Sequence, residues 1–326
     1  MNEPPTVAVS VVIPVYRSED CLERLVQETE AAFQSSGRTH EIVLVNDGSP
    51  DGSWEKIVDL AGRYLTVRGV NLRRNFGQDN ALMAGLRVAT GRIVVIMDDD
   101  LQHSPWDADR LIQQVEQGFD VCYARFPVKK QALWKNVGSW LNGKVANVVL
   151  GKPDRIYLSP YKAIAGAVVR EIVKYEGPYP YVDGLLLRVT DNITQIDVEH
   201  HERYAGRGNF NLVRSVSTWL KLATSFSLTP LRIASILGFG FACFGLGLAA
   251  FFAVRQLVGR GAPLGWASTI VAILVLGGVQ LACLGLIGEY LGRVFLHLNR
   301  RPQYVVKEMC GGPGSAGGDA RDRENV

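Results

Sequence analysis

The stretch that decides the fold is Ile93-Val94-Val95-Ile96-Met97, followed at once by Asp98-Asp99-Asp100-Leu101-Gln102. A short apolar run that is rich in β-branched residues and bounded by Gly91 predicts a strand buried on both faces. The acidic residues then stand at the carboxyl end of this strand. In open α/β sheets the loops at that end form the ligand-binding crevice.

Three adjacent carboxylates repel one another, so their proximity costs free energy unless water screens them or a cation neutralises them. A hard divalent ion, bound through one or two carboxylates and the phosphates of a substrate, is the usual solution. We therefore predict a metal and diphosphate site at Asp98, Asp99 and Asp100, with Gln102 as a further oxygen donor. The alternative is a solvated acidic turn that caps the helix near Trp106.

Strand and helix patterns alternate around this stretch. Such alternation predicts a doubly wound α/β domain with a mostly parallel sheet and right-handed crossovers. The predicted strands are residues 7–13, 41–45, 67–71, 93–97 and 120–123, and the predicted helices are 21–33, 57–61, 80–89 and 106–117. Beyond them we predict a helix at 161–175 and short strands at 185–189 and 193–198.

Charged residues also follow other predicted strands. Asp47 follows the second strand and Arg125 the fifth, so both are expected near the acidic triplet at one edge of the sheet. A helix cap is the alternative role for Asp47. The turn Asn75-Phe76-Gly77-Gln78 follows the third strand and is expected at the same edge.

Two long uncharged runs, residues 233–254 and 261–288, distinguish the second part of the chain from the first. Each is long enough for a helix that crosses about 30 Å of hydrocarbon, so we predict two transmembrane helices. Arginines and lysines precede the first run and follow the second, which predicts that both flanks are cytoplasmic. Arg255 and Arg260 in the connecting loop weaken this rule without reversing it.

The remaining composition narrows the class of protein. The early apolar run contains Pro14 and has no basic segment before it, so we expect no secretory signal. The five cysteines have no metal-ligand spacing and fit reduced thiols. The formal net charge of +3 identifies no partner by itself, and we expect none among nucleic acids. The domain prediction is 1–210 as the α/β domain, 211–230 as an interfacial amphipathic helix, 231–290 as the transmembrane pair and 291–326 as a cytoplasmic segment with a disordered tail.

Two further segments suit a membrane surface. Residues 131–150 form an amphipathic helical pattern with Trp134 and Trp140, which fits either the core or the lipid interface. Residues 200–210 read His-His-Glu-Arg-Tyr-Ala-Gly-Arg-Gly-Asn-Phe. The arginines of this loop, Arg203 and Arg207, could bind a phosphate, with a solvated turn as the alternative.

Several motifs together resemble the inverting family-two glycosyltransferases of GT-A fold, and in particular the polyprenyl-phosphate glycosyltransferases, such as dolichol-phosphate mannose synthase, bactoprenol glucosyltransferase and undecaprenyl-phosphate aminoarabinose transferase. The motifs occur in the same order over nearly the whole chain: VSVVIPVYRSED, EIVLVNDGSPDGS, NLRRNFGQDNALMAGL, DDDLQ, HERYAG, TPLRIASILG and IGEYLGRVFLHLNRRPQY. A lone acidic motif would be weak evidence, whereas the ordered set is specific.

The resemblance implies roles for particular residues. Three groups follow from it: a nucleotide pocket at Pro14, Tyr16 and Asp47; a metal and diphosphate site at Asp98, Asp100 and Gln102; phosphate contacts at Arg125 and Arg203. A glutamate of the first motif carries over to Glu19. This sequence departs from the family pattern at Asp99, where alanine is common, and at Gly208 and Phe210, where the acceptor loop usually has serine and tyrosine.

The resemblance also implies a function. The expected reaction moves a sugar from a nucleotide-sugar, with uridine diphosphate favoured as the carrier, to a polyprenyl (undecaprenyl) phosphate, with Mg²⁺ or Mn²⁺ as cofactor. Membrane lipids are expected partners at the inner membrane, and a homo-oligomer stays open. The alternatives are a processive polysaccharide synthase, whose Q-x-x-R-W motif is absent from this sequence, and a catalytically silent membrane anchor that binds a nucleotide-sugar.

Overall fold

The computed structural model describes residues 7–126, 156–177, 179–198, 265–298 and 302–312, together with scattered helical positions between 231 and 254. The chain divides into two compact units. The first unit combines Met1–Asn147, Gly151–Phe210 and Arg300–Val326, and the second combines Val148–Leu150 and Asn211–Asn299.

The first unit is built on one mixed, mostly parallel sheet with the strand order β7-β5-β6-β4-β1-β2-β3-β8. The predicted α/β class is therefore confirmed. Strands β1, β2, β3 and β4 pair in parallel, as do β5 and β7, whereas β6 and β8 run antiparallel to their neighbours. The strands are β1 (Val9–Val15), β2 (His40–Asn46), β3 (Val67–Leu72), β4 (Ile93–Ile96), β5 (Val121–Arg125), β6 (Lys162–Ala165), β7 (Ile193–Asp197) and β8 (Val306–Gly311).

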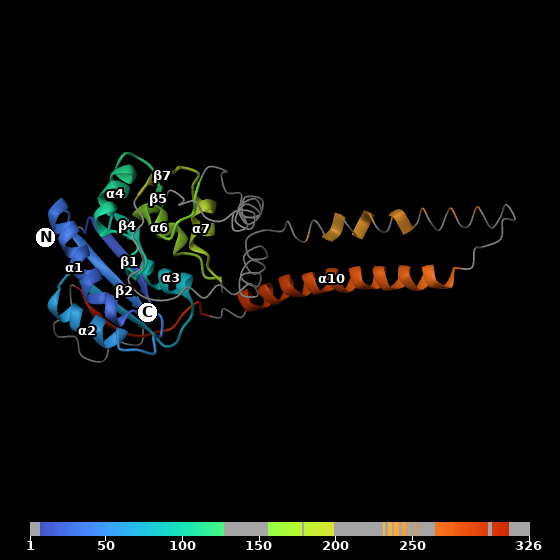
Figure 1. Cartoon of the computed structure of the whole chain (residues 1–326), viewed down its shortest axis with the longest axis horizontal. Coiled ribbons are helices and arrows are strands. Elements are labelled where there is room, and N and C mark those ends of the chain that lie inside the picture. Colours follow the sequence, from blue (N-terminus) through green and yellow to red (C-terminus); the bar gives the residue numbers. More distant parts are fainter. Residues whose placement is uncertain are drawn as a thin grey trace. The chain divides into compact units, whose positions relative to one another are not determined.

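Helices cover both faces of this sheet, which is why β1 and β4 are buried along their whole lengths. The helices of this unit are α1 (Glu19–Ser36), α2 (Ser53–Arg63), α3 (Gln78–Val88), the 3-10 turn η1 (Pro105–Asp107), α4 (Ala108–Glu116), α6 (Gly166–Ile172) and α7 (Val182–Val189). Figure 1 shows α1 and α3 on opposite sides of β1 and β2.

The two faces have different packing. Val11 and Ile13 join the main core with Leu25 of α1 and Leu111 of α4. On the other face α3 lies very close to the sheet, because a Cβ added to Gly85 would be 2.4 Å from Cγ1 of Val12. Glycine at this position permits the close approach.

The structure corrects two sequence predictions. The predicted helix at 161–175 begins as strand β6 and becomes helical only at Gly166, and the predicted strand at 185–189 lies in helix α7. In both places a short apolar segment fits the period of a helix and that of a strand. The position between β4 and β5 selects a strand for the first segment, and packing against α6 selects a helix for the second. Strand β8 was not predicted at all. The other strands and helices predicted before residue 126, and β7, are confirmed within a few residues at their ends.

The described part of the second unit is dominated by α10 (Trp266–Leu298). This helix includes most of the second uncharged run. Within the described residues, no helix is both long enough and apolar enough to cross a membrane. The predicted amphipathic segments at 131–150 and 211–230, and the loop at 200–210, lie outside the described residues.

Candidate active site

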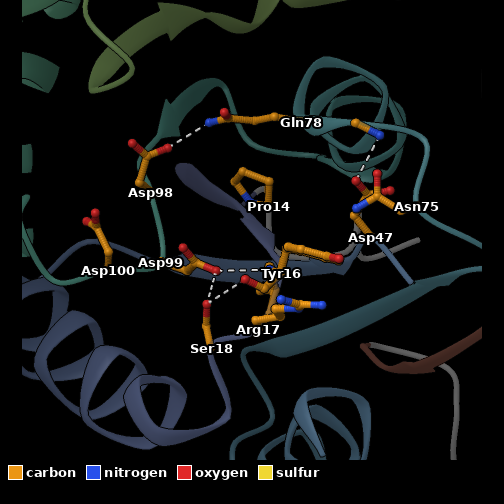
Figure 2. Close-up of a pocket in the computed structure, with 12 residues that line it drawn as sticks. Pro14, Tyr16, Arg17, Ser18, Asp47, Asn75, Gln78, Asp98, Asp99 and Asp100 are labelled. Atoms are coloured by element: carbon orange, nitrogen blue, oxygen red, sulfur yellow. Dashed lines mark hydrogen bonds between the residues drawn. The ribbon is translucent and has the colours of Figure 1, made fainter. Parts of the chain in front are cut away.

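The ends of four adjacent parallel strands surround one cavity of about 410 Å³. Figure 2 shows the side chains around it. The cavity brings together six of the predicted site residues, namely Pro14, Tyr16, Asp47, Asp98, Asp99 and Asp100. Its other lining residues are Val15, Arg17, Ser18, Asn75, Gly77 and Gln78. The convergence follows from topology, because parallel neighbours end at the same edge of the sheet.

Asp99 fixes the loop that follows β1. Its Oδ2 accepts a hydrogen bond from the backbone N–H of Tyr16 at 3.1 Å and another from the Ser18 hydroxyl (Figure 2). Between these residues, Arg17 has a φ of 58°, a strained value for a residue with a side chain. Asp99 thus holds two loops together and stabilises the backbone conformation of Tyr16.

Asp47 has the same function between the loops after β2 and β3. Its two oxygens accept the backbone N–H groups of Phe76 at 2.7 Å and Gly77 at 2.9 Å. Burial raises the pKa of Asp47 above its ordinary value, although both hydrogen bonds oppose the rise. Gly48 lets the two loops approach closely, because a Cβ added to Gly48 would lie 2.4 Å from the carbonyl carbon of Arg74. Gly48 also has a φ of +61°, which glycine adopts without strain.

Asp98 and Asp100 form the acidic side of the cavity. Asp98 Oδ1 accepts a hydrogen bond from Gln78 Nε2 at 2.8 Å, and Asp100 Oδ1 accepts one from the backbone N–H of Gln102 at 3.1 Å. The pKa of Asp98 is raised to about 6, first by burial and then by the charges of Asp100 and Asp99. A cation beside Asp98 would favour its ionised form, because it would offset both the cost of burying the charge and the repulsion from Asp100 and Asp99.

This donor set fits a divalent ion that is bound jointly by the protein and by the substrate. Among the described residues, no three His, Cys, Asp or Glu side chains are grouped so that they could hold a metal by themselves. Asp98 and Asp100 line the same cavity and offer carboxylate oxygens, which hard cations prefer. Mg²⁺ in particular is often bound by one or two carboxylates with water and substrate phosphates completing the shell.

Three predicted site residues lie outside the cavity lining. Arg125 forms a two-point ion pair with Asp197 of β7, at 2.5 and 2.8 Å. Glu19 Oε2 accepts a hydrogen bond from the backbone N–H of Gly52 at 2.9 Å, so Glu19 joins α1 to the start of α2. Gln102 contacts Asp100 through its backbone. Arg203 and Arg207 lie outside the described residues.

Sequence reasoning missed a buried polar cluster on the α3 side of the sheet. Lys162 of β6 forms an ion pair with Asp183 of α7, and the Tyr123 hydroxyl donates to the same Asp183 oxygen at 2.9 Å. Nearby, Asp79 accepts the backbone N–H of Val182 at 3.1 Å. The signal that could have revealed the cluster was a single lysine at the start of an apolar segment, but the predicted helix at 161–175 concealed its place in the sheet.

Comparison with known proteins shows which families the sequence matches. Residues 10–166 match the family described as Glycosyl transferase family 2, and residues 229–294 match the one described as GtrB C-terminal hairpin. The chain is 33% identical over 311 residues to a Synechocystis protein named as an uncharacterized glycosyltransferase, covering 94% of this chain and 96% of that protein.

Two other relatives are named undecaprenyl-phosphate 4-deoxy-4-formamido-L-arabinose transferase. The protein of Pseudomonas savastanoi is 33% identical, with 95% of this chain and 93% of that protein covered. The protein of Yersinia pestis is 30% identical, with 95% and 96% covered. Among solved structures, glucosyl-3-phosphoglycerate synthase of Mycobacterium tuberculosis aligns with a TM-score of 0.49 and 16% identity, over 68% of this chain and 79% of that one.

Proposed function

Because this chain belongs to glycosyl transferase family 2 and is a glycosyltransferase, we propose that it transfers a sugar from a nucleotide-sugar to a polyprenyl phosphate, with undecaprenyl phosphate as the first candidate. Two relatives that match over almost their whole length carry undecaprenyl-phosphate in their names, which supports this acceptor. The relatives do not decide the sugar, because at 30–33% identity the pocket can differ by the few contacts that distinguish one hydroxyl group from another.

One observation carries the proposal: a single cavity contains both the carboxylate of Asp47 and the acidic loop of Asp98 to Asp100. In this proposal, Pro14, Tyr16 and Asp47 form the nucleotide end of the donor pocket. Tyr16 is 43% exposed, and the Arg17 guanidinium lies 5.4 Å from the centre of its ring. In this proposal the exposed part of the ring stacks on the base. Asp99 holds the loop of Tyr16 in position.

The acidic loop forms the diphosphate end. Asp98 and Asp100 would hold Mg²⁺ or Mn²⁺, and the ion would stabilise the charge that develops on the leaving diphosphate. Gln78 orients the carboxylate of Asp98 by its 2.8 Å hydrogen bond. The acceptor phosphate is already an anion at neutral pH, so the protein must position it rather than remove a proton. Direct attack from the face opposite the leaving group would invert the anomeric centre.

The acceptor end of the proposal includes the membrane. We propose that residues 233–254 and 261–288 form two transmembrane helices, because both runs lack charged residues. The basic flanks favour a catalytic domain on the cytoplasmic face of the inner membrane. Arg203, Arg207 and Arg125 are the candidate phosphate contacts, and opening of the Arg125 pair with Asp197 would release that guanidinium.

The test is a transfer assay with the purified full-length protein, undecaprenyl phosphate, Mg²⁺ or Mn²⁺ and a panel of radiolabelled nucleotide-sugars. A product that extracts into organic solvent and carries one sugar supports the proposal. A growing water-soluble polymer would identify a processive synthase instead, and no product with any donor would favour a silent anchor.

The variant Asp100→Asn should reduce metal-dependent transfer at least about 100-fold, because removal of a group that stabilises the transition state costs several kcal/mol. The protein should still fold and stay in the membrane fraction. Asp107→Asn is the matched control, since Asp107 lies on η1 outside the cavity lining. Wild-type turnover in Asp100→Asn would refute the assignment.

A further inference from the structure

Lys162 is a buried cation that the proposed mechanism does not use. Its side chain is 3% exposed, and its ammonium forms an ion pair with Asp183, whose side chain is 15% exposed. The ammonium also lies 5.2 Å from the centre of the Tyr123 ring. A lysine so far from water is costly unless its charge interacts with other charges, so its position requires an explanation.

Strand register puts Lys162 on the same face of the sheet as Asp98. Lys162 pairs with Ile96 across the antiparallel β4 and β6, and directly opposed residues lie on the same face. Asp98 follows Ile96 by two residues, and the intervening Met97 still donates its N–H to Val12. Met97 and Ala163, the neighbours of these residues, both pack in the core on the opposite face.

The charges around Lys162 are mostly negative. Asp98 and Asp79 both feel the ammonium, which lowers the pKa of each against the larger effect of burial. Asp183 holds the ammonium through an ion pair. One positive charge therefore stands below an acidic loop that carries three carboxylates.

We propose that Lys162 is a positioning residue of the acidic loop: its ammonium, held by Asp183, partly offsets the loop's negative charge and so weakens the binding of a divalent cation until the donor diphosphate adds its own charge. The inference rests on the proposed function, because it assumes that the loop receives a cation together with a diphosphate. It assigns to Lys162 and Asp183 the coupling between these two ligands.

The proposal predicts three effects on Mn²⁺ affinity without donor. Lys162→Met removes the opposing charge and should tighten Mn²⁺ binding by about fivefold to tenfold, as expected for a unit charge acting over several ångströms in a partly buried site. Asp183→Asn leaves the ammonium without its partner and should weaken binding by about threefold to tenfold. The double variant removes both charges, so its Mn²⁺ affinity should lie between those of the two single variants.

The experiment is an electron paramagnetic resonance titration of free Mn²⁺ with the full-length protein in a non-ionic detergent. Lys162→Arg keeps the charge and should leave Mn²⁺ affinity near that of the wild type. Lys174→Met is the matched control, because Lys174 is paired with Glu171 on the surface of the same unit and is 68% exposed. Thermal unfolding of each variant is measured in parallel.

A purely structural role for Lys162 would lower the unfolding temperature and could only weaken Mn²⁺ binding, so tighter binding by Lys162→Met separates the two explanations. Unchanged or weaker binding in folded Lys162→Met would overturn the inference, as would a double variant whose affinity lies outside the range between the two single variants. Wild-type protein that binds no Mn²⁺ at millimolar concentration would overturn it as well. If Mn²⁺ affinity changes as predicted in the three variants but the wild-type protein transfers no sugar, the inference stands and the proposed function is refuted.

Discussion

Strand β2 carries a buried carboxylate near each of its ends, and the two have different roles. Glu41 near the start accepts hydrogen bonds from the Ser10 hydroxyl at 2.5 Å and from the backbone and hydroxyl of Thr90 at 2.7 and 2.8 Å. It therefore joins β1 and β2 to the segment before β4. Asp47 follows the other end, where the strand ends surround the cavity. The same functional group joins strands at one edge of the sheet and joins the loops beside the cavity at the other.

Asp47→Asn should weaken donor binding about tenfold. An asparagine can accept only through one oxygen, so one of the N–H groups of Phe76 and Gly77 loses its acceptor and faces an amide N–H, at a cost of about 1–3 kcal/mol. Isothermal titration with the active nucleotide-sugar measures the dissociation constant. Asp59→Asn is the control on the exposed side of α2. Donor affinity equal to that of the wild type would contradict this role for Asp47.

At the scale of elements, the start of helix α7 depends on a side chain from another helix. Asp79 of α3 accepts the backbone N–H of Val182 at the start of α7. Burial raises the pKa of Asp79 to about 6. Since the ordinary value is about 4, the folded state prefers the protonated form. The stability that Asp79 contributes is fully present below about pH 4 and is lost as the pH rises through about 6, because the folded state then has to hold a buried carboxylate charge.

Asp79→Asn should therefore raise the unfolding temperature at pH 8, by about 2–4 °C, and have little effect at about pH 3.5, where Asp79 is protonated in both the folded and the unfolded state. The amide is neutral at both pH values and still accepts the N–H of Val182 through its oxygen. Unfolding followed by intrinsic fluorescence at the two pH values measures the difference, with exposed Asp191→Asn as the control. A lower unfolding temperature at pH 8 would show that the charge of Asp79 stabilises the fold.

Strand β8 extends the sheet beyond β3 and is the element that links the far end of the chain to the α/β unit. Gln303 Nε2 donates to the carbonyls of Tyr175 and Gly177, both at 2.8 Å, and Asn71 Nδ2 donates to Glu308 at 2.9 Å. Asn71 in turn accepts a hydrogen bond from Asn46, the residue before Asp47, at 2.8 Å. A contiguous set of bonds thus joins β8 to β2, the strand that Asp47 follows.

Gly69→Val should displace β8, because the added Cβ would lie 2.5 Å from Cγ2 of Ile57 and 2.6 Å from Sγ of Cys310. Overpacking of this kind costs about 1–3 kcal/mol. Hydrogen exchange of residues 306–311, read by mass spectrometry, should become faster than in the wild type. Gly62→Ala is the control, since an added Cβ there meets nothing within 4 Å. Unchanged exchange would mean that the sheet accommodates the side chain.

At the scale of the whole molecule, the chain combines a sheet-based unit with a second unit that holds both long uncharged runs. Residues 229–294, which contain these runs, match a family described as a hairpin. In the proposed two-span arrangement, the basic residues before and after the runs predict that both flanks lie on one side of the membrane. The sheet unit draws strands from both sides of the hairpin in the sequence, since β8 pairs with β3.

Alkaline phosphatase fusions test this topology, because the enzyme is active only outside the cytoplasm. We expect high activity for a fusion after residue 258, between the two runs, and at least about 10-fold lower activity after residue 312, given that basic flanks stay on the cytoplasmic side. Immunoblots normalise the activity to the amount of each fusion. Equal activity at both positions would refute the two-span arrangement.

The sequence by itself determined the parallel centre of the sheet and the position of the cavity. Apolar runs of strand length reveal buried strands locally, and the residues just after them, such as Asp47 and Asp98, must lie at one edge once those strands are parallel. This inference needs only the order of elements along the chain. It extends to Tyr16, which follows β1, and to the acidic loop after β4.

Only the tertiary structure decided which partners these residues have. The insertion of β6 between β4 and β5 put Lys162 below the acidic loop, the pairing of β8 with β3 joined residues 237 positions apart at Asn71 and Glu308, and the β7 neighbour of β5 turned Arg125 toward Asp197. Short segments such as 162–165 suit a helix or a strand equally well, so contacts distant in sequence select between them. The physical reason is that local periodicity specifies which face is buried, whereas the packing of distant elements specifies what lies against it.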